Sequence, residues 1–378
     1  MNRPTMPRVT LPAPLRSKPA KIVGVVVLVV FLYALPILDL PILTTPDSDF
    51  GGVLYTIATY VLIALGLNIV IGYAGLLDLG YVGFYAIGAY VTAVLGVQHG
   101  HWPFLATIPV AVAVTMLSGV ILGAPTLRVR GDYLAIVTLG FGEIIRLAAK
   151  NSDWLGGARG IQNVPKPPSV HLFDVPHLRW ENGTVLIDVS NKTEAFVFGF
   201  IDYVPYYWLA LTVVFIVLFA DVLIKSSRVG RAWEATREDE DAAEVMGVPT
   251  FRYKLLAFAT GAFVGGLSGS ISAAGANFIY PDSYQIQVSI IFVAAVVIGG
   301  QGNRWGVMLG AALVVYLPER FRGLEEYRIL MFGVALMLLA TFRPQGLLPP
   351  RRARQARRLE RDLEELEVGD EDVQEVRS

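Results

Sequence analysis

The polar side chains that interrupt long apolar stretches are the residues of this chain most able to do chemistry. Hydrophobic residues make up 54% of the sequence and charged residues 17%, against about 25% charged in an ordinary soluble protein. Asp78 stands beside the glycine-rich run Gly72–Gly80, and Asn68 precedes it by about three helical turns. Clustered glycines permit a broken helix whose backbone polar groups face a pathway through a membrane. We therefore expect Asn68, Asp78 and Tyr81 to line such a pathway, with helix capping as the alternative role of Asp78.

A second group of charged residues lies in the polar segment Lys225–Lys254. Thr236 and Asp239 match the first and last positions of a capping box, which predicts the start of a short helix. The acids Glu238–Asp241 would then lie in its first turn, where the helix dipole favours them, and Gly247 would end it. We interpret this helix as a docking site for a soluble partner; a solvated amphipathic loop is the alternative.

The sequence offers little support for enzyme chemistry. It contains no Gly-Lys-Ser or Gly-Lys-Thr, so the phosphate-binding loop of ATPases is absent and the chain is not expected to hold ATP. Its four histidines fall in predicted loops without an acid cluster at metal-ligand spacing, and it has no cysteine. We therefore expect no catalytic residue, no metal site and no cofactor in the chain. A net charge of −1 also argues against a nucleic-acid binder.

The elements that would position these residues are apolar segments of about 20 residues, the length that crosses a bilayer. We predict an all-α, polytopic membrane protein of about ten transmembrane helices within residues 22–342, between tails 1–21 and 343–378. The predicted spans are Ile22–Leu43, Val53–Ile71, Leu76–Val97, Pro103–Gly123, Tyr133–Ala149, Tyr203–Ile224, Leu255–Gly275, Ile286–Gly300, Trp305–Leu317 and Ile329–Phe342. The last three are short.

Glycines at four-residue spacing indicate where these helices pack closely, because lipid supplies no hydrophobic force between them. One ladder lies in the span Leu255–Gly275 and another near Trp305–Leu317. The glycines are Gly261, Gly265, Gly269, Gly302, Gly306 and Gly310.

The distribution of Lys and Arg predicts the orientation, because these residues resist translocation. The N-terminal tail carries basic residues and no acid, so it should be cytoplasmic. Alternation then places Gly72–Gly75, Lys225–Lys254, Gln301–Arg304 and the C-terminal tail inside, and Ala276–Gln285 outside. The long insertion 150–202 is also external. Within it, Glu181-Asn182-Gly183 is a turn signal that predicts a small external β-hairpin.

Several long stretches resemble the LivM-type permeases of branched-chain amino acid ABC importers, in the family's order. They are GLNIVIGYAGLLDLGYVGFYAIGAYVTAVL (Gly66–Leu95), LRVRGDYLAIVTLGFGEIIRL (Leu127–Leu147), GGARGI (Gly156–Ile161), SRVGRAWEATREDEDAAEVMGVPTFRYKLLAF (Ser227–Phe258), VVIGGQGNRWGVMLGAALV (Val296–Val314) and FRPQGLLP (Phe342–Pro349). Many members have Ser in the glycine-rich motif where this chain has Asp78.

The resemblance implies a multi-pass subunit of a prokaryotic inner membrane with both termini cytoplasmic. Its expected partners are a related second permease, two cytoplasmic ATPase subunits that hold ATP and Mg, and a periplasmic or lipid-anchored binding protein. By analogy, Arg231 to Glu244 would be the segment that couples to one ATPase. Its charged residues are Arg231, Glu234, Arg237, Glu238, Asp239, Glu240, Asp241 and Glu244.

Two other functions stay open at this point. Urea and amide permeases resemble the same family and share these motifs, so composition does not separate leucine from urea as substrate. An ion-coupled secondary transporter is the other alternative, with Asp78 and Glu143 as coupling carboxylates and no partner ATPase.

Overall fold

The computed structural model describes most of the chain between residues 18 and 349. The described residues are 18–38, 49–98, 100–127, 132–169, 174–181, 184–194, 197–199 and 202–320, with positions 327, 330, 333–334, 337, 341–342 and 346–349. Most of the predicted span Ile329–Phe342 and most of both tails lie outside the described residues. The chain divides into two compact units, one of Met1–Phe50 with Leu172–Ala195 and one of Gly51–His171 with Phe196–Ser378.

The first unit contains the helix α1 (Lys18–Leu38) and a pair of strands, β2 (Asp174–Glu181) and β3 (Thr184–Glu194). The strands pair antiparallel from Glu181 opposite Thr184 outward, with a register shift between Pro176 and His177. The pairing lies where the Asn-Gly turn signal predicts a hairpin. Its location outside the membrane stays a prediction.

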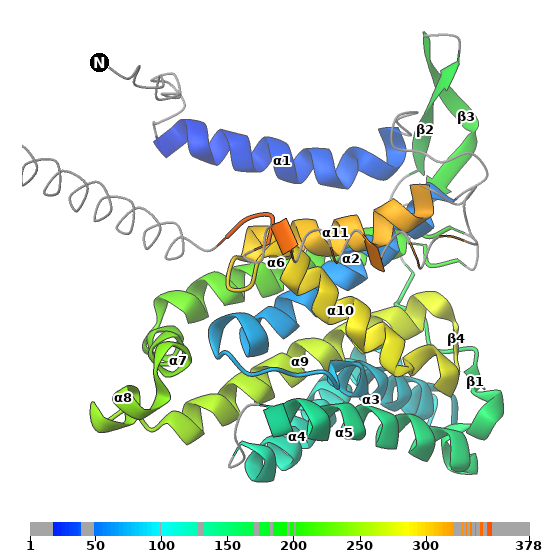
Figure 1. Cartoon of the computed structure of the whole chain (residues 1–378). Helices are drawn as coiled ribbons and strands as arrows, with labels where there is room; N and C mark the ends of the chain where they lie inside the picture. The colour runs from blue at the N-terminus through cyan, green and yellow to red at the C-terminus, as the bar shows by residue number, and fades with distance from the viewer. Residues whose placement is uncertain are drawn as a thin grey trace, which may run out of the picture. The chain divides into compact units, whose positions relative to one another are not determined.

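The second unit contains most of the helices (Figure 1). Its main helices are α2 (Phe50–Leu67), α3 (Tyr81–Ala93), α4 (Phe104–Thr126), α5 (Asp132–Asn151), α6 (Val204–Ser226), α7 (Arg228–Glu238), α8 (Glu240–Val245), α9 (Thr250–Ala276), α10 (Ile286–Gly299) and α11 (Arg304–Arg320). Its shorter elements are the π-helices η2 (Asn68–Tyr73) and η3 (Val94–Gln98), the 3₁₀ helices η4 (Asp153–Leu155), η5 (Gly157–Arg159) and η6 (Pro281–Tyr284), and the strands β1 (Ile161–Gln162) and β4 (Phe278–Ile279).

Six helical stretches among the described residues are long and apolar enough to cross a membrane. They are Phe50–Tyr73, Tyr81–Gln98, Phe104–Thr126, Val204–Ser226, Thr250–Ala276 and Pro281–Gly299. All six overlap predicted spans. At three further predicted spans the described helices are less typical of a membrane-crossing helix. The apolar part of α1 is short, α5 carries several charges, and α11 is short, with 17 residues. The total of about ten therefore stays a prediction.

Helix α9 packs against both α3 and α4, and its glycines allow the close approach. A Cβ atom on Gly261 would lie 2.4 Å from Val70, and one on Gly269 would lie 2.0 Å from the carbonyl oxygen of Tyr85. The first glycine ladder is therefore a packing surface, as predicted.

The prediction that the second glycine ladder is a helix-packing surface is only partly correct. Gly306 and Gly310 pack against the main chain of Gly299 in α10. Gly302 lies in the turn before α11 with φ of +82°, a conformation that favours glycine, so it belongs to the turn and not to the helix surface.

The predicted helix break is present between η2 and α3. Residues 74–80 are irregular, and Figure 1 shows them as an extended connection that runs alongside the helices to the start of α3. Irregular backbone at membrane depth needs partners inside the protein. The N–H of Leu79 donates to Thr138 Oγ1 at 3.1 Å, and the N–H of Gly80 donates to Asp78 Oδ1 at 2.9 Å.

The loops of the second unit gather at two ends. Helices α7 and α8 lie at one end and the paired strands β1 and β4 at the other (Figure 1). Parts of Gly72–Gly75, Lys225–Lys254 and Gln301–Arg304, three loops predicted to be internal, meet at the α7 end. The strands come from two segments predicted to be external. This grouping agrees with the predicted alternation of loops; which end faces the cytoplasm stays a prediction.

Candidate functional site

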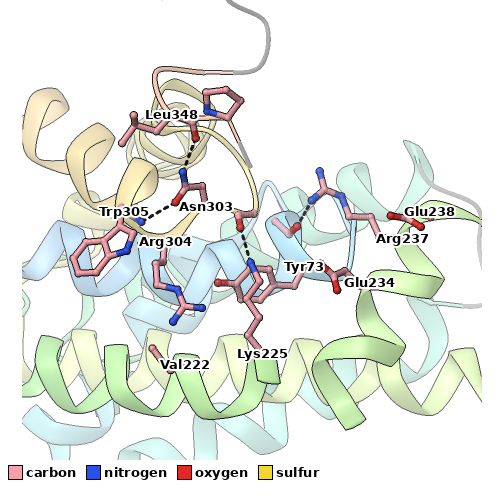
Figure 2. A pocket seen from close by; sticks show the side chains of 13 residues that line it. Tyr73, Val222, Lys225, Glu234, Arg237, Glu238, Asn303, Arg304, Trp305 and Leu348 are labelled. Carbon is pink, nitrogen blue, oxygen red and sulfur yellow. Dashed lines mark hydrogen bonds between the residues drawn. The ribbon is translucent and has the colours of Figure 1, made fainter. Parts of the chain in front are cut away.

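An open pocket of about 870 Å³ lies at the α7 end of the second unit, where four predicted internal segments converge (Figure 2). Its walls come from the end of η2, the end of α6, α7, the turn before α11 and the Leu348–Pro349 segment. The lining residues are Gly72, Tyr73, Val222, Lys225, Glu234, Arg237, Glu238, Gly302, Asn303, Arg304, Trp305, Leu348 and Pro349.

A buried carboxylate beside the pocket organises one side of it. Asp221, on α6, is only 3% exposed. Its Oδ2 atom lies 3.3 Å from Nε of Arg304 and accepts a hydrogen bond from the hydroxyl of Tyr73 at 3.2 Å. A buried carboxylate is costly unless it is paired and hydrogen-bonded, and these two contacts supply both conditions. The cluster joins α6, η2 and α11.

Lys225, one turn further along α6, holds the turn before α11. Its Nζ donates to the carbonyl oxygen of Gly302 at 2.9 Å and lies 4.5 Å from the centroid of the Tyr73 ring. The N–H of the same glycine donates to Asn68 Oδ1 at 2.8 Å. Both polar groups of Gly302 are therefore bonded to side chains of other helices.

Arg237 connects α7 to the helix break. Its Nη1 atom donates to the carbonyl oxygen of Gly72 (Figure 2), one of the carbonyls that the end of η2 leaves without a helical partner. Burial lowers the pKa of this guanidinium, and the carboxylates of Glu238 and Glu234 act in the opposite direction. The side chain thus links the predicted docking segment to the glycine-rich break.

The docking segment consists of two helices, so the single helix predicted from Thr236 is wrong. Ser227 caps α7, which runs through Thr236, and the hydroxyl of Thr236 donates back to Ala232 at 2.8 Å. The second helix, α8, is capped by Asp239, whose side chain accepts from the N–H of Ala242 at 2.9 Å. In a run of consecutive acids, the capping box was assigned to the wrong residue. The predicted end at Gly247 is correct, since φ there is +86°.

The charged residues of this segment have different surroundings. Arg231 donates to the carbonyl oxygen of Ser226 at 3.0 Å, and Glu240 forms an ion pair with Lys254 of α9. Glu234 and Glu238 line the pocket. Asp241 and Glu244 are exposed on α8.

The tip of the segment also presents apolar side chains. Val245 is 88% exposed and Met246 is 84% exposed. Behind them, the buried Trp233 donates its Nε1–H to the carbonyl oxygen of Tyr253 at 2.7 Å and fixes α7 on α9. The result is an anchored arm with an apolar, acidic tip.

The three predicted pathway residues lie near the break, and none of them is among the residues that line the 870 Å³ pocket. Asn68 is buried in η2, and its Nδ2 has no hydrogen-bond partner among the described residues. Asp78 accepts from the N–H of Gly80 through Oδ1, a turn bond just before α3; the N-cap of α3 is Gly80, without a side-chain cap, so Asp78 does not cap the helix. The buried Oδ2 of Asp78 is unpartnered within the same residues. Tyr81 donates to the carbonyl oxygen of Gly261 at 2.7 Å. Their role in a pathway stays a prediction.

Residues Asp221, Lys225 and Arg304 were not predicted as site residues. The sequence places each of them near an internal loop. Their mutual contacts depend on how helices far apart in the chain pack, and no local pattern encodes that.

Long apolar helices, a broken helix and an open polar pocket at one end together define a membrane transport protein. The chain belongs to the family described as branched-chain amino acid transport system / permease component, which matches residues 50–341.

Curated relatives agree with this assignment. The chain is 41% identical over 298 residues to the high-affinity branched-chain amino acid transport system permease protein LivM of Salmonella typhimurium, covering 77% of this chain and 68% of the relative. The LivM protein of Escherichia coli K12 gives the same identity and coverage. The permease protein LivH of the same strain is 25% identical over 303 residues, covering 77% of this chain and 91% of that protein. No solved structure matches the chain.

Proposed function

We propose that this chain is the translocating subunit of an ATP-binding-cassette importer for leucine, isoleucine and valine. It works without an ATPase site of its own, and ATP and Mg are held by two cytoplasmic partner subunits. The observation that carries the proposal is the match to the branched-chain amino acid permease family over residues 50–341, with 41% identity to LivM proteins. The bond from Arg237, in the predicted docking segment, to Gly72 at the helix break supports the coupling part of it.

The α7–α8 arm is the proposed contact with one ATPase. The anchor at Trp233 gives the arm a fixed base. The exposed Val245 and Met246 supply an apolar contact, and Asp241 and Glu244 supply charge. Large apolar side chains that are almost fully exposed are typical of interaction sites.

The second proposed partner in the membrane is a related permease. Relatives of two kinds, LivM and LivH, match this one chain, which supports a pair of similar subunits. A periplasmic or lipid-anchored binding protein would deliver the substrate at the β1–β4 end. In this arrangement the chain spans a prokaryotic inner membrane about ten times with both termini cytoplasmic.

Reconstitution in liposomes tests the proposal. The chain is combined with its second permease, both ATPases and the binding protein, and the initial rates of leucine and urea uptake are measured. We expect leucine uptake that requires ATP and every partner. Matched liposomes that contain the chain alone, with a proton or sodium gradient, should accumulate nothing.

Two results would overturn the proposal. Uptake by the chain alone in an ion gradient would favour a secondary transporter. Urea uptake by the complete complex in place of leucine uptake would identify a urea permease.

A further inference from the structure

A second cavity, of about 200 Å³, lies away from the polar pocket, between α2, α3, α9 and α10. Its wall includes four aromatic side chains from different elements: Tyr60, Tyr85, Tyr284 and Phe292. The ring of Phe292 lies 5.2 Å from Tyr60 and 5.7 Å from Tyr85 between centroids. The ring of Tyr284 lies 5.5 Å from that of Tyr85. The rings contact one another and form a connected aromatic wall.

The location of this aromatic cavity suits a transported molecule. Part of its wall is Tyr85, in the second turn of α3, the helix that begins after the break. Another part is β4 with η6, at the end predicted to face outward. Transporters commonly bind substrate beside discontinuous helices, and the cavity reaches from such a helix to the end where a binding protein would deliver it.

The size and the aromatic lining of the cavity fit a branched aliphatic side chain. A dry apolar cavity of about 150 Å³ is enough to hold benzene, so about 200 Å³ holds a branched side chain of three or four carbons. The polar groups at the wall include the hydroxyls of Tyr85 and Ser272, which are hydrogen-bonded to each other. No charged side chain is among the lining residues. Tyr60, Ser283 and Tyr284 add further hydroxyl groups to the lining, so the aromatic carbons offer an apolar contact and the hydroxyls a polar one.

We propose that the aromatic cavity binds the branched aliphatic side chain of the transported amino acid and sets the upper limit on its size. The ammonium and carboxylate groups remain at the open side of the cavity, in contact with water. This inference rests on the proposed function and deepens it, because it assigns a substrate-contact site within the permease itself.

Filling the cavity provides the test. Ala276, the last residue of α9, lines it and is exposed to the open side. Ala276→Leu adds three carbons there. The matched control is Ala148→Leu, the same change at an exposed position of α5 that does not line the cavity. Leucine and valine uptake are measured in the complete complex at concentrations that saturate the binding protein, so that its own preference does not contribute.

We expect Ala276→Leu to lower the ratio of leucine to valine uptake by roughly tenfold, the discrimination that one methylene gives in a close-fitting apolar site. Ala148→Leu should leave the ratio unchanged. ATP turnover in the presence of the loaded binding protein verifies that each complex is assembled.

The outcomes separate this inference from the proposed function. Suppose that the unmodified complex transports leucine, and that Ala276→Leu lowers the leucine and valine rates equally or leaves both unchanged. The cavity then does not discriminate between side chains by size, and this inference fails while the proposed function stands. If Ala276→Leu does not assemble, Val288→Phe on α10 fills the same cavity from a different wall, and an unchanged ratio there contradicts the inference. If the unmodified complex does not transport amino acids, the proposed function fails first.

Discussion

Replacing Arg237 by Met tests whether α7 is mechanically tied to the helix break. The substitution keeps an unbranched side chain of similar length but removes the donor to the carbonyl oxygen of Gly72. A hydrogen bond to a charged group contributes about 1.5–3 kcal/mol. Because this guanidinium is only partly buried, we use the lower value of about 1.5 kcal/mol, which corresponds to about a tenfold change in an equilibrium constant.

Arg237→Met should weaken the coupling between ATP hydrolysis and leucine transport, and it should leave assembly with the ATPases intact. The arm keeps its anchor, since Trp233 bonds to Tyr253 independently of Arg237. We therefore expect Arg237→Met to co-purify with the ATPases and to hydrolyse ATP, while the amount of leucine transported per ATP falls by about tenfold. The assay measures both rates in the same liposomes.

Arg231→Met is the matched control for this prediction. Arg231 lies on the same helix and donates to Ser226, within its own segment and away from the break. It should preserve the transport-to-hydrolysis ratio. Normal coupling in Arg237→Met, or an equal loss in both variants, would refute the argument that this bond transmits motion.

Three further predictions concern the rest of the chain. Reversing Asp241 and Glu244 to Lys should abolish co-purification of an ATPase while leaving membrane insertion intact, because both acids are exposed and neither caps a helix; retention of the ATPase would move the docking site elsewhere. Asp78→Asn preserves the acceptor for Gly80, so normal uptake would indicate a structural role in the turn before α3, whereas a marked loss with normal assembly would support a pathway role. Single cysteines at Ser169 and Ser226 can be labelled with an impermeant thiol reagent without background; in intact cells only the first should react, and the reverse pattern would invert the proposed orientation.

The sequence predicts the helices well because their cause is local. Apolar runs of membrane length predict the six clearest spans, and the glycine cluster predicts the break before Tyr81. Glu143 and Arg146 form an ion pair that has the same local cause, since residues three apart on a helix face each other. The structure adds Asp282, which lies 2.7 Å from Arg146 and comes from a distant segment.

The candidate site is predicted less well because it depends on tertiary packing. The segment Lys225–Lys254 contains helix as predicted, but the sequence does not reveal its division at Asp239, since neighbouring polar side chains compete for the same capping role. Its docking role stays a prediction. The pairing of Asp221 with Arg304 has no local signal at all. The aromatic cavity was missed for the same reason, because its walls come from four separate helices.

The polar contacts around the pocket suggest how motion of the arm would reach the pathway. The carbonyl oxygens of Gly72 and Gly302 accept from Arg237 and Lys225, so side chains of α7 and α6 hold two segments that lack regular helical bonding. A buried acceptor that loses its donor costs about 1–3 kcal/mol. Any displacement of α7 must therefore either carry the end of η2 with it or leave the carbonyl of Gly72 unpaired. The extended residues 74–80 follow directly and lead to α3, whose Tyr85 forms part of the wall of the aromatic cavity. We therefore expect a displacement of Gly72 to reach that wall through this connection.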